Sequence, residues 1–528
     1  MSSQRPDPRV PALLLLALCL AAPASAHHDE DPGDEVPPSW ETTTDGGMLS
    51  DDVARFAVAS RSDNNSVESL FVTAVRVKSD ALQALGIDDF DVVTSAFDVE
   101  TGALRWTTAY DAGLGIFDQP AGIELNYNNN LLHVVADSDG DASIVTYAVS
   151  DGSELVVTTL PGATVHGTAI SVSGSEMAVV GQRGGDFFFA DYESGPQAIT
   201  IDSTSVAGAA FAVAIHDKTW TTPSGGSDWA PGNTDSWRTF VATGRAGGFA
   251  GADVYTAAWR MDQVGHAPVW VRTWDGPDGD WDEGLAAETG YVRATGQTLA
   301  WTAGRTRNAS GDWDIAVQAH DLNTGVPAWS GQVRLWGGEG ATEDAPVAMW
   351  YAGATEILYV TGTTDRGAPH GQDIVTLAYR GTTGELLGEA LSSGDVSNGD
   401  DDPIAVTATH DGNRVFVAAE ILDLLPEGGT KHRAALFAFD RGLVAPAGFA
   451  WLDEGGFGVD QVGGVATDVG QGAVLLGGST DPESGDRQDL AGASFPIVEF
   501  VPEPGATGSL TACAALLAAL ARRRPGRG

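Results

Sequence analysis

Six aspartates recur at matching places along the chain, and their type and spacing could perform chemistry. Each stands just before a short run of small residues that opens one repeat: Asp52, Asp118, Asp282, Asp344, Asp402 and Asp460. Carboxylate oxygens are the ligands that Ca²⁺ prefers. If these positions surround one opening, the carboxylates would focus negative potential there and form a site for a cation or a basic ligand. The structural alternative is that each aspartate caps its own turn, as aspartate commonly does.

Two further stretches carry metal-ligand residue types. The segment DSDGDAS places Asp137, Asp139 and Asp141 as in the first half of a calcium loop, but its twelfth position, which should be glutamate, is Ala148. A solvated turn between two strands is therefore favoured. The segment HHDEDPGDE, which begins at His27, could chelate a metal, although an acidic leader is the commoner meaning of such a run.

Conventional catalytic motifs are missing from the sequence. It contains no phosphate-binding glycine-rich loop, no Gly-x-Ser-x-Gly and no His-Glu-x-x-His. Its two cysteines, Cys19 and Cys513, lie in terminal segments that we expect to be removed, so neither a cysteine nucleophile nor a cysteine zinc site is predicted. The histidines His216, His320 and His410 lack partner spacing and are interpreted as strand or turn residues.

Composition narrows the classes of partner. The 528 residues include 72 acidic and 28 basic side chains, giving a net charge of −44. Such a surface excludes nucleic acid as a partner and disfavours anionic membranes. The 67 glycines and the apolar share of 43% indicate a packed, turn-rich fold rather than a disordered chain.

The amino-terminal segment predicts export. Arg5 and Arg9 flank an apolar run that ends in Ala24-Ser25-Ala26. A charged start, a short apolar centre and small residues at Ala24 and Ala26 are the features of a cleaved signal peptide. The predicted organisation is a signal peptide over residues 1–26, an acidic leader over 27–38, the fold over 39–500 and a sorting tail over 501–528.

The carboxyl-terminal tail also carries a signal. Pro502-Glu503-Pro504 is followed by an apolar run over residues 509–521 and then by Arg522, Arg523 and Arg524. This order resembles the PEP-CTERM sorting signal of bacteria that use an exosortase. The resemblance implies processing by exosortase, transient membrane retention, and release or attachment at the cell surface. The apolar run is shorter than the ~20 residues of a spanning helix, which favours a processed tail over a stop-transfer helix.

Between these signals the chain repeats. A β-branched, strand-like run recurs eight times with a period of about 57 residues, and each run is followed by a polar turn and a second strand. With a strand before and a strand after this pair, the pattern predicts an all-β, eight-bladed β-propeller with four-stranded blades. The last unit lacks its fourth strand. The segment SWETTTDGG at 39–47 is similar to LRWTTAYDAG at 104–113, with Trp40 at the place of Trp106. We therefore expect an amino-terminal strand to supply the missing fourth strand and close the ring.

One motif occurs twice without a gap, as AFDVETGALRW at 96–106 and AHDLNTGVPAW at 319–329. We interpret it as structural: the alanine allows blades to approach, the glycine makes the turn, and the tryptophan fills the wedge between blades. The residues in these roles are Ala96, Gly102, Trp106, Ala319, Gly325 and Trp329, with Trp40, Trp270 and Trp451 as further wedge residues.

This motif resembles the tryptophan-docking motif of PQQ-type propellers, which are commonly eight-bladed. The segment DPIAVTATHDGNRVFVAAE at 402–420 similarly resembles the bacterial SBBP-type propeller repeat. The resemblance covers roughly residues 39–500 and concerns the architecture. Quinoprotein enzymes of this architecture usually combine the cofactor with Ca²⁺, an acidic base and a vicinal cysteine pair, and the cysteine pair is absent here.

We therefore expect an exported, non-enzymatic binding or scaffold module at the cell surface or in the extracellular matrix, with a protein or polysaccharide ligand. The alternative is an extracytoplasmic enzyme, either a quinoprotein dehydrogenase or a glycan hydrolase or lyase. No cofactor is predicted other than Ca²⁺ at the aspartates. Signal peptidase and exosortase are the expected processing partners, with membrane contact only through the tail.

Overall fold

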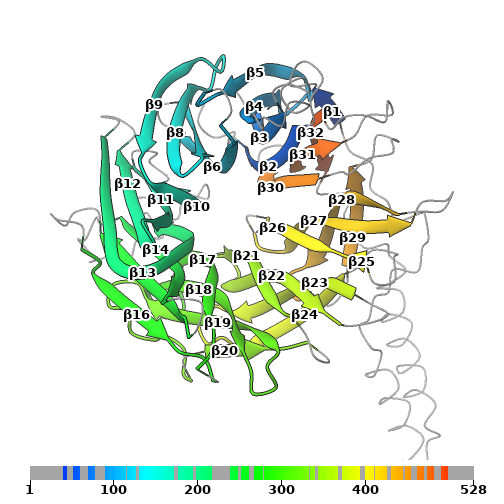
Figure 1. Ribbon diagram of the computed structural model, residues 1–528. Coiled ribbons are helices and arrows are strands. Elements are labelled where there is room, and N and C mark those ends of the chain that lie inside the picture. The colour runs from blue at the N-terminus through cyan, green and yellow to red at the C-terminus, as the bar shows by residue number, and fades with distance from the viewer. Residues whose placement is uncertain are drawn as a thin grey trace, which may run out of the picture.

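The computed structural model describes residues 40–44, 52–59, 69–77, 90–113, 116–126, 130–171, 176–193, 198–216, 238–247, 251–260, 267–277, 279–331, 333–338, 343–366, 371–392, 399–409, 411–424, 430–443, 446–452, 461–468, 473–480 and 489–496. Every element from β1 to β32 is a strand, and no α-helix occurs in these ranges. The strands form antiparallel sheets arranged as blades around a common centre (Figure 1).

The first four blades follow one another along the chain. Blade one contains β2 (Asp52–Ala59), β3 (Ser69–Val77), β4 (Phe90–Asp98) and β5 (Leu104–Tyr110). Blade two contains β6 (Asp118–Asn126), β7 (Leu131–Ser138), β8 (Asp141–Ala148) and β9 (Glu154–Leu160). Blade three contains β10 (Ala163–Ile170), β11 (Glu176–Arg183), β12 (Asp186–Glu193) and the first half of β13 (Ala198–His216). Blade four contains the second half of β13 with β14 (Thr239–Ala246), β15 (Asp253–Arg260) and β16 (Trp270–Trp274).

The remaining blades complete the ring. Blade five contains β17 (Glu283–Val292), β18 (Gln297–Arg307), β19 (Trp313–Asp321) and β20 (Val333–Trp336). Blade six contains β21 (Ala345–Ala352), β22 (Ile357–Asp365), β23 (Gly371–Arg380) and β24 (Leu386–Ser392), and the short β25 (Gly399–Asp400) pairs with β23 in parallel. Blade seven contains β26 (Asp402–Ala408), β27 (Arg414–Leu424), β28 (Thr430–Asp440) and β29 (Pro446–Leu452). Blade eight contains β30 (Gln461–Asp468), β31 (Ala473–Thr480), β32 (Asp489–Pro496) and β1 (Trp40–Thr44).

The long strand β13 belongs to two blades. Its first half pairs with β12 up to Ala207, and its second half pairs with β14 from Gly208 onward. When β13 is divided there, the seven sheets become eight units of four strands, with β25 as an additional fifth strand in blade six. The sequence prediction of an all-β propeller with four-stranded blades is confirmed.

The predicted closure of the ring by the amino-terminal strand is also confirmed. Strand β1 is antiparallel to β32 in the last blade, and Trp40 lies opposite Ser494. Trp106 lies opposite Ala96 in blade one and Trp270 opposite Ala258 in blade four. Ser494, Ala96 and Ala258 each follow the first aspartate of their strand by the same interval. Trp40 therefore occupies the ladder position of the other two tryptophans.

The core lies between successive blades rather than in one central mass. In β4, the third strand of blade one, every residue between the two end residues is buried. Outermost strands alternate instead, as in β9, which buries only its last residue fully. One apolar cluster joins blades five and six through Trp301, Trp329 and Leu377, with the ring of Tyr351 4.4 Å from that of Trp301. Burial on both faces explains the continuous apolar runs in the sequence.

A β-bulge interrupts the innermost strand of every blade at the same place. The extra residue follows three paired residues in blades one to four and two in blades five to eight, so the bulge gives a common reference point for comparing the blades. The bulge residues, from blade one to blade eight, are Arg55, Ala121, His166, Phe211, Leu285, Val347, Ile404 and Gly463.

Candidate functional site

The bulges show which of the predicted aspartates occupy equivalent positions. The equivalent position lies three residues before the bulge residue. Aspartate occupies it in six blades, as Asp52, Asp118, Asp282, Asp344, Asp401 and Asp460, and blades three and four have Ala163 and Gly208 there. Asp460 and the side chain of Asp52 lie outside the described residues.

In blade seven the equivalent aspartate is Asp401 and not Asp402, which the sequence interpretation selected. Asp401 is buried, and its Oδ1 accepts a hydrogen bond from the amide of Leu422 at 2.9 Å. Asp402 is exposed. Three aspartates follow one another at 400–402, and only the strand register decides which of them turns inward.

Three of the aspartates cap the connection that enters their blade. The Oδ2 atoms of Asp118, Asp282 and Asp344 accept hydrogen bonds from amides six residues earlier, at Ala112 (2.8 Å), Gly276 (2.5 Å) and Gly338 (2.7 Å). Their exposed fractions are 0%, 1% and 0%. The carboxylates therefore hold the crossing from the outermost strand of one blade to the innermost strand of the next. They do not stand in solvent around an opening.

The electrostatics of two capping residues follow from this burial. Burial raises the pKa of Asp118. The hydrogen bond from the Ala112 amide lowers this pKa, and the neighbouring negative charges of Asp111 and Asp91 raise it further. Burial also raises the pKa of Asp282, and hydrogen bonds from the Thr306 hydroxyl and the Gly276 amide lower it.

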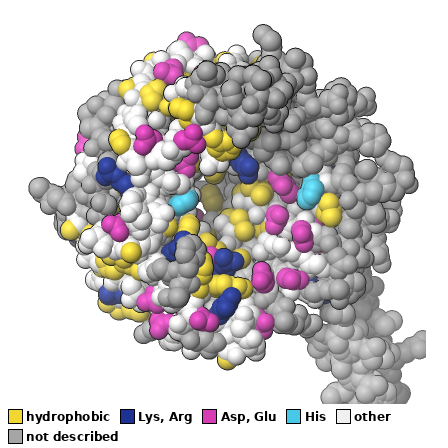
Figure 2. Space-filling model, in the orientation of Figure 1, with side chains coloured by type: hydrophobic (Ala, Val, Ile, Leu, Met, Phe, Trp, Pro, Cys, Tyr) yellow, Lys and Arg dark blue, Asp and Glu magenta, His cyan; other side chains and the backbone are white. Residues whose placement is uncertain are grey.

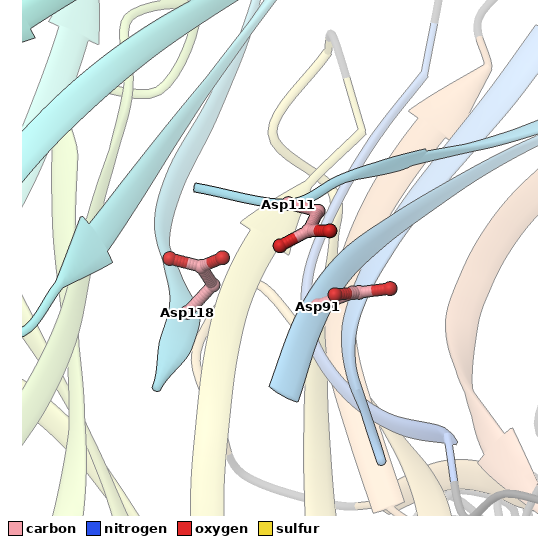
Figure 3. Close-up of side chains that lie close together, drawn as sticks. All are labelled: Asp91, Asp111 and Asp118. Atoms are coloured by element: carbon pink, nitrogen blue, oxygen red, sulfur yellow. The ribbon is translucent and has the colours of Figure 1, made fainter. Parts of the chain in front are cut away.

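Asp118 also belongs to a cluster of three aspartates at the junction of blades one and two. One carboxylate oxygen from each of Asp91, Asp111 and Asp118 lies within 4.8 Å of the others (Figure 3). Asp91 is near the start of β4, Asp111 directly follows β5, and Asp118 begins β6. This is the one group with metal-ligand spacing among the residues that the structure describes. We call it the junction cluster.

The other members of the junction cluster differ in exposure. Asp91 is buried and forms an ion pair with Arg76 at 3.0 Å. Asp111 is exposed, and its Oδ1 accepts a hydrogen bond from the Gly113 amide at 2.8 Å. Sequence reasoning missed Asp91 and Asp111. A signal for Asp91 was present, because the corresponding strand opens with aspartate in DVVTS, DVYTA, DIAVQ and DIVTL.

The aspartates of DSDGDAS serve separate purposes. Asp137 is buried and accepts hydrogen bonds from the amide of Val165, just before the bulge of the next blade. Burial raises its pKa to about 6. Asp139 has a left-handed φ of 48°, and Asp141 accepts a hydrogen bond from the Gly162 amide at 2.7 Å. The segment is a turn between β7 and β8, in agreement with the favoured interpretation.

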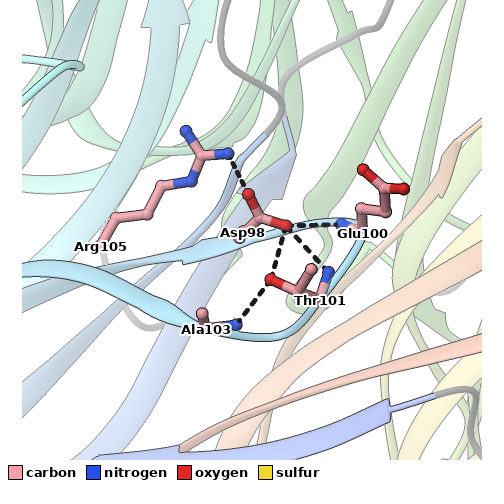
Figure 4. A network of polar contacts seen from close by, with 5 residues as sticks. All are labelled: Asp98, Glu100, Thr101, Ala103 and Arg105. Carbon is pink, nitrogen blue, oxygen red and sulfur yellow. Dashed lines mark hydrogen bonds and ion pairs between the residues drawn. The ribbon is translucent and has the colours of Figure 1, made fainter.

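The twice-occurring motif begins with a hydrogen-bonded turn (Figure 4). Oδ1 of Asp98 accepts from the amides of Glu100 (3.1 Å) and Thr101 (2.8 Å) and from the Thr101 hydroxyl (2.8 Å), and Arg105 forms an ion pair with the same carboxylate. Burial alone would raise the pKa of Asp98, but these contacts from Thr101 and Arg105 outweigh it and hold the pKa below its usual value. Asp321 and Thr324 repeat the turn in blade five.

Each described wedge tryptophan docks on the following blade. The indole Nε1 atoms of Trp106, Trp270 and Trp329 donate hydrogen bonds, each of 2.8 Å, to the carbonyls of Val149, Leu322 and Gly381. The ring then covers the glycine three residues farther on: Gly152, Gly325 or Gly384. A Cβ at these glycines would lie 2.6, 2.6 and 2.5 Å from the indole, and their φ angles are +68°, +66° and +67°. Glycine is required for two reasons: the backbone has a positive φ, and the indole ring leaves no space for a Cβ. In the motif of blade five, Trp329 inserts into the next blade while Gly325 receives Trp270 of the previous one.

Blade six uses a different contact, and blade seven also has glycine at the ladder position. Gly388 in blade six lies opposite Ala378, at the tryptophan ladder position, and a Cβ there would lie 2.0 Å from the Gly442 carbonyl of blade seven. In blade seven this position is Gly448, opposite Ala438, whereas Trp451 lies opposite Ala435. Trp451 is therefore not at the ladder position of the docking tryptophans. The side chains of Trp40 and Trp451 lie outside the described residues.

Several buried or partly buried ionisable groups inside the blades have perturbed pKa values. Burial raises the pKa of Glu124 to about 7, against a hydrogen bond from the Thr168 hydroxyl at 3.0 Å. Burial lowers the pKa of His133 to about 4, and its Nδ1 is 2.9 Å from the Thr146 hydroxyl. Burial likewise lowers the pKa of His320 to about 4, beside Gln318 and the Gly325 carbonyl. These histidines are neutral at physiological pH, and each also packs against an aromatic ring of a neighbouring blade, Tyr192 for His133 and Trp270 for His320.

Comparison with known proteins supports the fold alone. No protein-family model matches the chain, and no curated protein matches it. Among solved structures, the propeller of Dos1 is similar, with a TM-score of 0.51 and 9% sequence identity over 88% of this chain and 96% of that one. The strand order and this similarity define the protein as a β-propeller.

The targeting residues are not part of this description. The signal-peptide residues Ala24 and Ala26 and the tail residues Pro502, Glu503, Pro504, Arg522, Arg523 and Arg524 lie outside the described ranges. Within those ranges, no helix has the length and apolar character needed to cross a membrane.

Proposed function

We propose that the protein is an exported β-propeller that acts as a non-enzymatic binding or scaffold module at the cell surface or in the extracellular matrix. The closed ring supports a binding role, because it is a rigid frame that presents one residue from each blade around a common centre (Figure 1). The two terminal sequence signals support export.

The ring of bulge residues carries the proposal. The bulges lie on the innermost strands, and Figure 2 shows an opening at the centre of the ring with hydrophobic, basic and acidic side chains around it. Neighbouring bulge residues adjoin across blades, since the rings of His166 and Phe211 are 5.5 Å apart. An apolar arc spans blades four to seven through Phe211, Leu285, Val347 and Ile404, and Val347 is 40% exposed.

The composition of this arc favours a protein ligand over a polysaccharide. Protein interfaces combine an apolar centre with a polar rim, and the arc is flanked by His166 and continues to the exposed Arg55. Arg245 adds a cation–π stack, with its guanidinium carbon 5.4 Å from the ring of Phe211 and 4.9 Å from that of Trp281.

Crosslinking at the surface of producing cells tests the proposal. We expect a specific partner to be recovered with wild type and with Leu155→Asp, a matched control 52% exposed on the outermost strand β9. Recovery should fail with Val347→Asp, which places a charge in the arc. Equal recovery with both variants would contradict the assignment of the arc, and retention of the protein inside the cell would contradict export.

An assay for product formation distinguishes the enzymatic alternative from the binding role. The purified protein is incubated with a glycan panel, and separately with alcohols, PQQ and an electron-accepting dye. Binding without product formation agrees with the proposal. Product formation would overturn it in favour of a glycan-active enzyme or a quinoprotein dehydrogenase.

A further inference from the structure

We propose that Asp91, Asp111 and Asp118 bind one Ca²⁺ ion, which joins blade one to blade two. This site differs from the predicted ring of aspartates around the channel, because its three ligands come from a single junction. Two of them belong to blade one and the third begins blade two.

The distances suit a calcium ion. Calcium–oxygen distances are about 2.3–2.6 Å, so two ligand oxygens on one ion are separated by at most about 5 Å. The three carboxylate oxygens of the junction cluster meet this limit, because all lie within 4.8 Å of one another. In Figure 3 the carboxylate of Asp111 lies between those of Asp118 and Asp91.

The charges balance with a divalent ion. Three carboxylates bring three negative charges, and the guanidinium of Arg76, paired with Asp91, contributes one positive charge. The remainder of two negative charges equals the charge of one Ca²⁺ ion. Without a cation, three carboxylates whose oxygens lie within 4.8 Å of one another repel one another.

The second observation is an enclosed ligand atom. Asp118 is fully buried, and its Oδ1 has no hydrogen-bond partner among the residues that the structure describes. The Ser138 hydroxyl is near enough to oppose the rise in the pKa of Asp118, but it does not meet hydrogen-bond geometry with any described residue either. A buried carboxylate oxygen without a partner is costly unless a cation or water satisfies it.

Calcium fits better than other ions of the same charge. All three ligands are hard oxygens, which disfavours zinc and copper. Asp111 is exposed, so water can complete the six to eight ligands that Ca²⁺ accepts in flexible geometry. Magnesium demands a nearly ideal octahedron at shorter distances.

Two other junctions provide contrast. At the junction of blades four and five, Asp253, Asp275 and Asp282 occupy equivalent positions, but they do not form a group with metal-ligand spacing, and the Thr306 hydroxyl interacts with Asp282. At the junction of blades five and six, Gly337 stands where Asp111 stands in the first. Asp275 is therefore a matched control, because it has the sequence position of Asp111 without the cluster.

Calorimetric titration of the purified full-length protein with CaCl₂ tests the site, together with melting curves in CaCl₂, MgCl₂ and NaCl at equal ionic strength. Asp111→Asn removes one ligand charge and keeps an acceptor for the Gly113 amide. We expect wild type and Asp275→Asn to show the same calcium affinity and the same calcium-specific rise in Tm. Asp111→Asn should lose at least tenfold in affinity and most of that rise.

A second readout is terbium luminescence excited through the adjacent Tyr110. Terbium should be displaced by calcium in wild type and in Asp275→Asn, and its signal should fall in Asp111→Asn. The proposal is overturned if calcium raises Tm no more than sodium does. It is also overturned if Asp111→Asn retains the full affinity, or if both variants lose equally, which would indicate general charge screening.

Discussion

Adding one methyl group at Gly152 should destabilise the propeller much more than the same change at Gly162. Gly152 lies at the turn between β8 and β9, Gly162 lies at the connection from β9 to β10, and both have a φ of +68°. A Cβ at Gly152 would lie 2.6 Å from the indole of Trp106, whereas a Cβ at Gly162 would meet nothing within 4 Å. Gly162→Ala therefore measures the backbone penalty alone, and Gly152→Ala measures the same penalty together with the clash.

The magnitudes follow from these contacts. Placing alanine in the left-handed region costs about 1–2 kcal/mol, which is the whole expected effect at Gly162. At Gly152 the indole must also move. This overpacking costs about 1–3 kcal/mol, and loss of the Trp106–Val149 hydrogen bond costs about 1 kcal/mol more. The total for Gly152→Ala is then about 3–6 kcal/mol.

A double-mutant cycle isolates the docking contact. Trp106→Ala alone should cost about 3–5 kcal/mol, because it empties a buried wedge. In that background the Gly152→Ala penalty should fall to the backbone value of about 1–2 kcal/mol. Urea midpoints of the four proteins, and hydrogen exchange at residues 149–152, measure the coupling. Equal penalties at Gly152 and Gly162, or a Gly152 penalty that persists without Trp106, would refute the account of the docking contact.

Three further predictions concern closure of the ring, the partly buried carboxylate of Glu124 and the carboxyl-terminal tail. Removal of residues 27–47 deletes β1 and leaves β32 as an open edge, so Tm should fall clearly; an unchanged Tm would mean that β1 contributes nothing to closure. Burial raises the pKa of Glu124 to about 7, from an ordinary value of 4.5, so the native state holds a proton that the unfolded state has lost. Stability should therefore fall as pH rises from about 4.5 to 7, and Glu124→Gln should remove up to about 3 kcal/mol of this loss in urea titrations at several pH values; a parallel pH profile for the variant would argue against it. Residues 502–528 transferred to a secreted reporter should make its processing depend on exosortase, and identical processing in cells without that enzyme would count against the sorting signal.

Much of the fold could be predicted from the sequence because its signals are local. Strand runs, turn residues and the period of the repeat are properties of neighbouring residues, so they predicted four strands in each blade and a closing strand around Trp40. The docking motif was also readable as structural, since Ala96, Gly102 and Trp106 lie within one hairpin and its flanking strand.

The tertiary structure decided what depends on register and on contacts between blades. A slip of one residue moves a side chain to the other face of a strand, which is why Asp401 and not Asp402 is the buried aspartate of blade seven. The glycine that receives Trp106 belongs to the next blade, a relation that no motif within one blade expresses. Asp91, Asp111 and Asp118 lie in or beside β4, β5 and β6 and come together only where blades one and two meet. Sequence spacing predicted the aspartates that recur, whereas only packing between blades shows which of them meet.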